Sequence, residues 1–251
     1  MNMRSASELE EFEKVQAERR EYVKNIGIEY RFGCYEEKRA DSCHLLGEYM
    51  EAIERNFKSA LSLFSLNCEQ RKYAPSCFKY SMYLLAGKEC EPSLSKTIPH
   101  LEISCESNIP VACRYLGLVY WNGEPTRLAD PKKAEACMKK ACDLEDAKAC
   151  WMLSTWYLGP TAKFKRKDEE LETKYTHLMG SLERDMAASL EYGIRACELN
   201  VPESCANVGR MYKIGDGMEK NVEKAKEYYD KAKDIIKNLK ERDVKPDFTG
   251  I

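Results

Sequence analysis

Cysteine is the residue type in this chain with the greatest capacity for chemistry, and it occurs 12 times in 251 residues. Ten of the cysteines form five close pairs, with seven or eight residues inside each pair: Cys34 with Cys43, Cys68 with Cys77, Cys105 with Cys113, Cys142 with Cys150, and Cys197 with Cys205. Zinc-binding pairs usually enclose about two to four residues, so this spacing does not favour a metal site. A high and even number of cysteines favours disulfides. We predict a disulfide within each pair and reduced thiols at Cys90 and Cys137.

The two remaining cysteines differ in their expected surroundings. Cys137 lies five residues before a paired cysteine, on a helical face that is core-facing or half-buried, and we predict a buried, small hydrophobic side chain. Cys90 lies in a loop, where we expect it to be more exposed. Its neighbours Glu89 and Glu91 should raise the pKa of the thiol and so lower its reactivity. The alternative is a reactive resolving thiol, which would make the protein a thiol–disulfide oxidoreductase.

Two short motifs suggest a nucleophilic serine. Ser76–Lys79 and Ser93–Lys96 both read Ser-x-x-Lys, as in β-lactamases, but neither Ser-Asp-Asn nor Lys-Thr-Gly accompanies them. The chain also has no P-loop, glycine-rich nucleotide fingerprint or His-Glu-x-x-His motif. A pattern as short as Ser-x-x-Lys occurs often by chance. We therefore assign no catalytic residue and do not expect an enzyme.

The three histidines, His44, His100 and His177, are too few and too scattered to indicate a metal site. His100 shares the helical face of Cys137, so we expect it to pack against the core. Noncovalent haem ligation by a histidine and a methionine is an alternative, since both residue types bind haem iron. Covalent c-type attachment is excluded because the sequence has no Cys-x-x-Cys-His motif. We predict no cofactor, with haem as the alternative.

Composition restricts the class of protein. Lys and Arg number 40 and Asp and Glu number 42, and the net charge of −2 gives no general attraction to nucleic acid or to an anionic membrane. No apolar run approaches the ~18 residues that a transmembrane helix needs. Only 13 glycines and 9 prolines occur, which argues against a turn-rich all-β chain. With 43% hydrophobic and 33% charged residues, the chain fits a set of amphipathic helices.

The second cysteines of the pairs mark an internal repeat. They are separated by 34, 36, 37 and 55 residues, and periods of about 34 to 40 residues are typical of helical-hairpin solenoids. Apolar residues recur three and seven positions after these cysteines, and small residues recur four positions after them, at Gly47, Ser81, Gly117, Ser154 and Gly209. Because these positions share one helical face, the repeat predicts a helix A that begins at the second cysteine of a pair. A helix B then ends at the first cysteine of the next pair, and each disulfide crosses the turn between two units.

The repeated motif resembles the Sel1-like repeat family, relatives of the tetratricopeptide solenoids. The family signature is Leu-Gly-x-x-Tyr, a glycine-containing loop and a second helix, and it is clearest at residues 115–123 and 208–217. The resemblance covers about residues 28–247. It implies an all-α, right-handed solenoid of five disulfide-linked hairpins.

We expect three regions along the chain. Residues 1–27 form an N-terminal helix that caps the array, residues 28–241 form the solenoid with a last helix at about Asn221–Glu241, and residues 242–251 form a tail. Asp130-Pro131 predicts the start of a helix B, with a capping carboxylate and a first-turn proline. The longest interval between cysteines indicates an insertion at about residues 161–185, in repeat four. Its charged sequence predicts a surface loop with a short helix near Leu171–Leu182, and a docking loop is the alternative.

The cysteine-linked form of the repeat occurs in bacterial cysteine-rich proteins and in a mitochondrial member of the family. Residues 1–24 contain six glutamates and no apolar signal segment, which favours the mitochondrial form over the secreted one. The segments Cys34–Lys38 and Arg210–Gly217 also match the mitochondrial member. The resemblance therefore implies residence in the mitochondrial intermembrane space, an oxidising compartment reached without a cleaved signal.

That resemblance also implies a function. We expect a non-enzymatic, disulfide-stabilised scaffold that binds proteins and supports the assembly of cytochrome c oxidase. The expected partners are respiratory-chain assembly proteins or subunits and the oxidative import relay of the compartment, with the chain itself a monomer. A thiol–disulfide oxidoreductase or haem-binding chaperone of the same pathway is one alternative. A secreted cysteine-rich interaction protein is the other.

Overall fold

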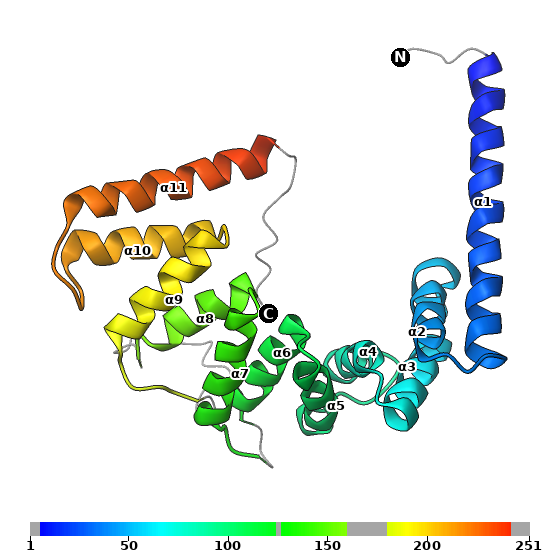
Figure 1. Ribbon diagram of the computed structural model, residues 1–251, viewed down its shortest axis with the longest axis horizontal. Helices are drawn as coiled ribbons and strands as arrows, with labels where there is room; N and C mark the ends of the chain where they lie inside the picture. Colours follow the sequence, from blue (N-terminus) through cyan, green and yellow to red (C-terminus); the bar gives the residue numbers. More distant parts are fainter. Residues whose placement is uncertain (1–5, 124–126, 160–179, 242–251) are drawn as a thin grey trace, which may run out of the picture. The chain divides into compact units, whose positions relative to one another are not determined.

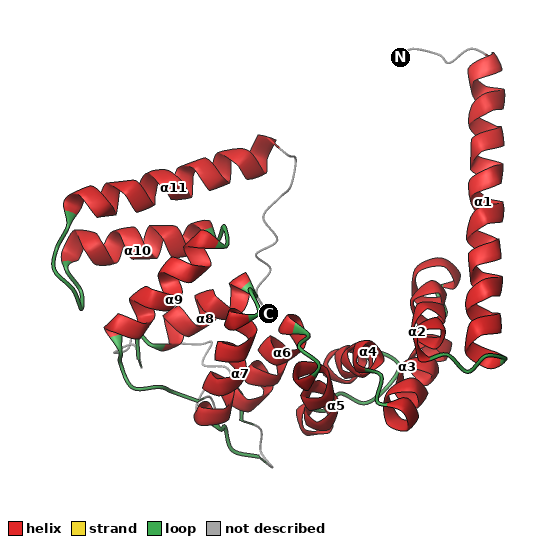
Figure 2. Ribbon diagram, viewed as in Figure 1, coloured by secondary structure: helices red, strands yellow, loops and turns green. Residues whose placement is uncertain are grey.

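The computed structural model describes residues 6–123, 127–159 and 180–241, and the regular structure in these ranges is helical throughout (Figures 1 and 2). The chain divides into two compact units, residues 1–103 and residues 104–251. Most consecutive helices pack on one another within each unit, which confirms the predicted all-α solenoid of disulfide-linked hairpins. None of the described helices combines the length and the apolar character that a membrane span requires.

Unit 1 begins with a long helix and continues as alternating helices A and B. Its elements are α1 (Ala6–Tyr35), α2 (Ala40–Tyr49), a short π-helical turn (Met50–Glu54), α3 (Phe57–Arg71), α4 (Ala74–Ala86) and α5 (Leu94–Glu106). Helix α1 packs on α2, α2 on α3, and α3 on α4. Helix α1 therefore runs without a break from the expected N-terminal cap to the first paired cysteine. The last residues of α5 belong to unit 2.

Unit 2 contains three further hairpins. Its helices are α6 (Pro110–Trp121), α7 (Pro131–Asp143), α8 (Ala147–Trp156), α9 (Met186–Glu198), α10 (Pro202–Ile214) and α11 (Val222–Glu241). Helix α11 matches the predicted last helix. The expected insertion lies largely outside the described residues, as does the tail. The helix predicted near Leu171–Leu182 reaches the described residues only at positions 180–182, which are not helical.

The helix starts follow from capping chemistry. The carboxylates of Asp130, Asp146 and Asp185 each accept a backbone N–H three residues ahead, at 2.9–3.0 Å, and so satisfy a donor that the first turn leaves unpaired. Proline occupies the first turn of α4, α6, α7 and α10, where the missing N–H costs nothing. The predicted helix start at Asp130-Pro131 is confirmed.

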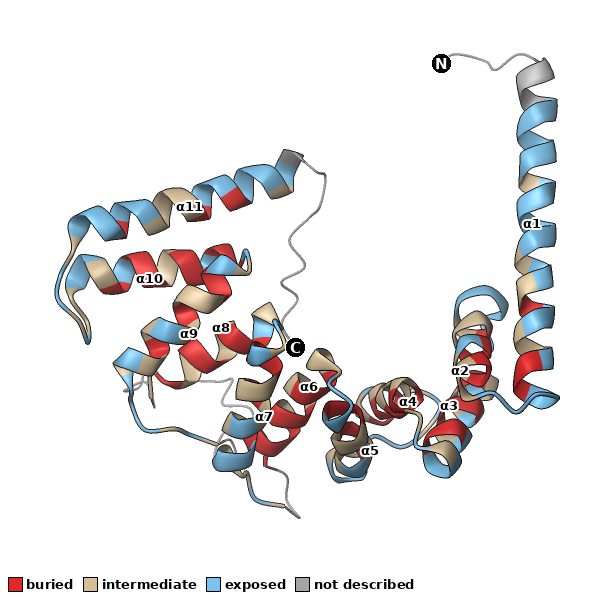
Figure 3. Cartoon of the chain, in the orientation of Figure 1, coloured by how far each residue is buried: buried red, intermediate tan, exposed pale blue. Residues whose placement is uncertain are grey.

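The column of small residues lets helices A and B approach closely. All five members of this column are buried, and buried residues line the contacts between neighbouring helices (Figure 3). A Cβ atom added to Gly47 would lie 2.5 Å from the ring of Phe64, and one added to Gly117 would lie 3.1 Å from the carbonyl oxygen of Ala134. A larger residue would therefore push the two helices of a hairpin apart.

Candidate functional site

Each of the five junctions between repeats joins the end of one helix to the start of the next through a disulfide. The bonds link Cys34 to Cys43, Cys68 to Cys77, Cys105 to Cys113, Cys142 to Cys150, and Cys197 to Cys205. The paired Cα atoms lie 4.5–4.8 Å apart, within the range that a disulfide needs. The backbone N–H of each second cysteine donates to the carbonyl four residues earlier, at 3.0–3.2 Å. This hydrogen bond fixes the second cysteine in the first turn of helix A, facing the end of the preceding helix B.

The turn inside each junction depends on one residue in the left-handed backbone region. These residues have φ between 54° and 66°, and they are Lys38, Lys72, Asn108, Glu145 and Asn200. Each stands three or four positions after the first cysteine, so the chain reverses direction at the same place every time. No pattern in the sequence predicted these residues. Asparagine tolerates this conformation better than most residues and gives a signal at two junctions, whereas lysine and glutamate give none.

The sulfur atoms are shielded from solvent. All ten paired cysteines are at most 5% exposed, and Cys77, Cys113 and Cys205, which begin helices A, are fully buried. A thiol in solution can therefore reach a junction disulfide only if the packing around it opens. This burial suits a structural link better than a bond that exchanges during turnover.

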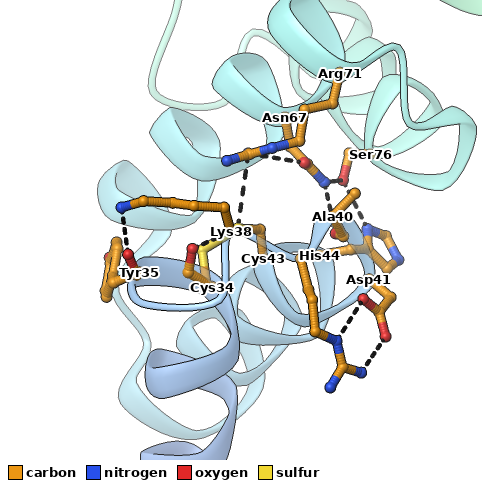
Figure 4. The surroundings of a disulfide bond; sticks show 11 residues. Cys34, Tyr35, Lys38, Ala40, Asp41, Cys43, His44, Asn67, Arg71 and Ser76 are labelled. Carbon is orange, nitrogen blue, oxygen red and sulfur yellow. Dashed lines mark hydrogen bonds and ion pairs between the residues drawn. A yellow bond between two sulfur atoms is a disulfide. The ribbon is translucent and has the colours of Figure 1, made fainter.

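In unit 1, polar side chains connect two successive junctions (Figure 4). The amide nitrogen of the buried Asn67 donates to the carbonyl of Ala40 at 2.9 Å and to the hydroxyl of Ser76 at 2.7 Å. His44 Nδ1 lies 3.1 Å from the same hydroxyl. Arg71 Nη1 lies 3.2 Å from Asn67 Oδ1 and 3.8 Å from the sulfur of Cys43, so it connects the network to the first disulfide.

In unit 2, an ion pair occupies the equivalent place. Arg114 Nε donates to both carboxylate oxygens of Asp146 at 3.0 Å, and the two side chains are only 12% and 8% exposed. Arg195 Nη2 donates to the carbonyl of Cys142 at 3.2 Å and pairs with Asp143 at 2.9 Å. Both arginines therefore hold the turn between α7 and α8.

The two Ser-x-x-Lys motifs have structural roles. The Ser76 hydroxyl is fully buried and accepts the Asn67 amide, while Lys79 Nζ pairs with Glu51 at 2.9 Å and does not face the serine. In the second motif the Ser93 hydroxyl accepts the backbone N–H of Lys96 at 3.3 Å, at the start of α5. Neither pair is arranged as a nucleophile and its base.

Cys90 and Cys137 lie outside the five disulfides, and each is half-buried. The expectation of a buried Cys137 is therefore wrong in degree. Cys90 is less exposed than its loop suggests, because its sulfur lies 3.5 Å from the carbonyl of Tyr83 and packs against the core of unit 1. Burial, followed by Glu91 and Glu89, raises the pKa of the Cys90 thiol against the opposite effect of Lys96. This site disfavours the thiolate form.

The two described histidines are engaged in packing. His44 lies between the rings of Phe64 and Tyr73, with centroids 5.6 and 5.7 Å away. The ring of His100 lies 4.8 Å from that of Tyr80, and its Nδ1 lies 3.5 Å from the sulfur of Cys68. Burial lowers the pKa of both imidazoles, so both are neutral at pH 7. His177 lies outside the described residues, and the described residues contain no group of His, Cys, Asp and Glu side chains that would hold a metal ion.

Unit 2 contains an open cavity of about 800 Å³. Its walls come from the start of α7, the end of α8, residues 181–185 and the start of α9. Lys132, Glu135 and Arg184 provide charges around it, and Tyr157 and Met186 provide apolar surface. Burial and a hydrogen bond to Glu135 raise the pKa of Tyr157 to about 12, so its hydroxyl stays a proton donor. A cavity with this mixed lining suits a polypeptide segment better than a small apolar ligand.

Comparison with known families and structures defines the class of protein. The Sel1 repeat matches residues 40–70, 110–146, 175–201 and 202–234. The fold resembles a protective antigen of uropathogenic Escherichia coli with an SLR fold, at a TM-score of 0.64 and 17% identity over 84% of this chain and 40% of that one. It also resembles a Sel1 repeat protein from Oxalobacter formigenes, at a TM-score of 0.59 and 15% identity over 78% and 71% of the two chains. The fold and the matched repeats are those of a Sel1-repeat protein.

Similar proteins from animals identify a family within this class. The chain is 34% identical over 237 residues to cytochrome c oxidase assembly factor 7 of Xenopus tropicalis, covering 91% of this chain and 94% of that protein. It is 33% identical to the homolog from Drosophila melanogaster, covering 86% and 88%, and 28% identical to the Homo sapiens protein over the same shares. The chain belongs to the cytochrome c oxidase assembly factor 7 family.

Proposed function

We propose that this chain supports the assembly of cytochrome c oxidase as a disulfide-stabilised, protein-binding scaffold in the mitochondrial intermembrane space. Family membership over about nine-tenths of the chain carries this proposal, because the relatives are named for that assembly role. The five junction disulfides support an oxidising compartment, since such bonds rarely persist where glutathione keeps thiols reduced.

The scaffold acts by holding protein segments, without bond-making chemistry of its own. Helical repeats of this kind present extended surfaces whose shape is set by packing between neighbours. The cavity beside α7 and α9 offers one such surface, with both signs of charge and several apolar side chains. Respiratory-chain assembly proteins or subunits are the proposed clients of a monomeric chain, and the oxidative import relay is the partner that forms the disulfides.

The alternatives receive less support from the described residues. An oxidoreductase needs an exposed thiol with a lowered pKa, whereas Cys90 is half-buried with a raised pKa. Haem ligation by His100 requires its imidazole to leave its contacts with Tyr80 and the sulfur of Cys68. A secreted interaction protein would share the fold, so localisation decides that alternative.

The test is to delete the gene and to measure assembled cytochrome c oxidase on native gels. Loss of the assembled enzyme and rescue by the wild-type chain are expected. Opening only the outer mitochondrial membrane should expose the protein to added protease, while a matrix marker stays protected. Normal oxidase levels in the deletion contradict the assembly role, and protection after the outer membrane is opened contradicts the compartment.

A further inference from the structure

Among the described helices, α1 has one neighbour fewer than comparable helices have. It carries the first cysteine of a junction, so it is a helix B, and it packs on the following helix A as α3 packs on α4. Helices α3, α7, α9 and α11 each also pack on the helix A that precedes them. The part of the chain that the structure describes contains no helix before α1.

The face of α1 that would meet such a helix is apolar. In repeat three, Ala134 and Met138, which stand eight and four residues before the junction cysteine, lie against Gly117 of helix A and are fully buried. The residues at the same distances from Cys34 are Ile26 and Tyr30, and both are only half-buried. Helix α1 therefore keeps the apolar chemistry of this contact face, although the described residues place no preceding helix A on it.

This apolar face continues toward the N-terminus. Tyr22, Val15 and Phe12 are 67%, 38% and 46% exposed, and most of α1 is coloured as exposed in Figure 3. Val15, Tyr22 and Ile26 form the α1 stripe. The stripe residues and the intervening Arg19 are spaced by alternating steps of three and four residues. This is the spacing with which one helix packs along another.

One edge of the α1 stripe is acidic. Glu11, Glu18 and Glu29 are exposed and lie along a single line of the helix, since their separations of 7 and 11 residues are close to whole turns. On the other side of the stripe, the backbone of Gly27 lies against the ring of Tyr49, so this edge borders α2. An antiparallel second copy of α1 would set its own acidic edge against this one, which like-charge repulsion opposes. A helix with basic residues along the matching flank meets no such repulsion.

We propose that the α1 stripe binds an amphipathic helix of a partner protein, antiparallel to α1, in the place that helix A of a preceding repeat would take. The partner helix presents small and aliphatic residues to Tyr22 and Ile26, as Gly117 does to Met138, and Lys or Arg to Glu11 and Glu18. Helix-in-groove recognition of this kind combines apolar anchors with flanking charge. This surface belongs to unit 1, whereas the cavity described above belongs to unit 2, and the inference does not depend on the cellular role proposed above.

The test uses a labelled synthetic helix of about 18 residues, long enough to be helical when bound, with an Ala/Leu stripe and Lys flanks. Its binding to the oxidised full-length protein is followed by fluorescence anisotropy. Val15→Glu with Tyr22→Glu should weaken binding at least about tenfold, as expected for loss of central apolar anchors. The matched control is Phe32→Glu, which is 58% exposed on a different face of α1 and should change affinity by less than about twofold.

A second peptide, with Glu in place of the flanking Lys, should bind at least about fivefold more weakly. Melting curves of the variants establish that each is folded, and the single Tyr22→Ala variant repeats the test with a milder change. Equal binding by the stripe variant and the control, or equal binding of the two peptides, overturns the proposal. Light scattering provides a further test. If the protein is a dimer that Val15→Glu with Tyr22→Glu dissociates, the proposal is also overturned, because the stripe would then bind a second copy of this chain.

Discussion

The junction between α3 and α4 in unit 1 can be compared with the junction between α7 and α8 in unit 2. A side chain from the preceding helix A contacts each of these two junctions. This side chain directly follows a junction cysteine, which is Cys43 in unit 1 and Cys113 in unit 2. In unit 1 this side chain is His44, which contacts Ser76, and in unit 2 it is Arg114, which contacts Asp146. Both contacts span 32 residues.

The difference shows what the repeat determines and what it leaves open. In both junctions helix geometry points the side chain after the cysteine toward the start of the next helix A, where it contacts a residue 32 positions ahead. The chemistry of that contact varies, from a neutral hydrogen bond in one unit to a buried ion pair in the other. The covalent link is common to both units, whereas the response to mutation and to pH should differ between them.

Full reduction should have the largest effect, and it should affect both units alike. Each disulfide closes a loop of about ten residues, which contributes about 2–3 kcal/mol in the chain-entropy model. Five of them contribute on the order of 10 kcal/mol, which is comparable with the whole net stability of many domains. We expect the reduced chain to lose most of its helical circular dichroism, which oxidative trapping after import would require.

Peptide mapping under non-reducing conditions first establishes the five pairs and the thiols at Cys90 and Cys137. Native helicity and a cooperative melt in the reduced, alkylated protein would show that packing alone holds the solenoid. A bond between Cys90 and Cys137 would refute the register of the repeat.

Loss of Arg114 should have the next largest effect, and it should be confined to unit 2. Arg114→Ala leaves the carboxylate of Asp146 nearly buried without its cation, which typically costs about 3 kcal/mol. The three tryptophans all lie in unit 2, so their fluorescence reports this unit alone. The matched control is Lys133→Ala, which removes a 63% exposed partner of Asp130 and should cost less than about 1 kcal/mol. Equal losses in the two variants would contradict a special role for the buried pair.

Removal of a single disulfide should have a larger effect in the middle of the array than at its end. Cys142→Ser with Cys150→Ser loosens a junction that has repeats on both sides, whereas Cys34→Ser with Cys43→Ser loosens the first one. In a solenoid, stability is close to a sum over neighbours, so the central pair should lower the steady-state level in cells more than the terminal pair does. Each costs about 2–3 kcal/mol. Immunoblotting of matched expression lines measures the difference in protein level. A larger loss for the terminal pair would contradict this prediction.

Much of this fold is predictable because its signals are local and repeated. The small residue four positions after each cysteine predicts close packing of helices, and Gly47 and Gly117 provide it. The carboxylate and proline at Asp130 predict the start of α7. Such features depend on a few neighbouring residues, which a single sequence displays.

Other features depend on geometry that no short segment displays. The left-handed turn residues Lys38 and Glu145 have no special propensity, so only the closure of the junction puts them there. Five residues before the junction cysteine, Cys137, His100 and Tyr192 are half-buried, whereas Leu63 at the same position is buried, so burial at this position depends on the neighbouring helices. Cys90 is drawn inward because its loop folds back onto Tyr83.

The pH dependence should give the smallest effect and the sharpest separation of the two units. Burial lowers the pKa of His44, and the neighbouring Lys79 adds to this against the opposite effect of Glu48 and Glu51. Burial also lowers the pKa of His100. Both histidines lie in unit 1. A pKa that is lower in the folded chain than in the unfolded chain means that the unfolded state binds more protons, so stability falls as the pH falls below the ordinary value of about 6.5.

Acidification from pH 7.5 to pH 5.5 should therefore loosen unit 1 before unit 2. Amide hydrogen exchange, corrected for the intrinsic effect of pH, should rise first in α2 to α4, while tryptophan fluorescence from unit 2 stays constant. His44→Gln keeps a group that bonds Ser76 and cannot titrate, so it should remove part of the change. His100→Gln tests the remainder in the same way. Two outcomes would contradict this prediction: a change in the fluorescence of unit 2 together with exchange in unit 1, or an unaltered pH profile in His44→Gln. In either case the neutral contact at Ser76 does not set the acid response. The chemical difference between the two junctions then has no consequence for stability.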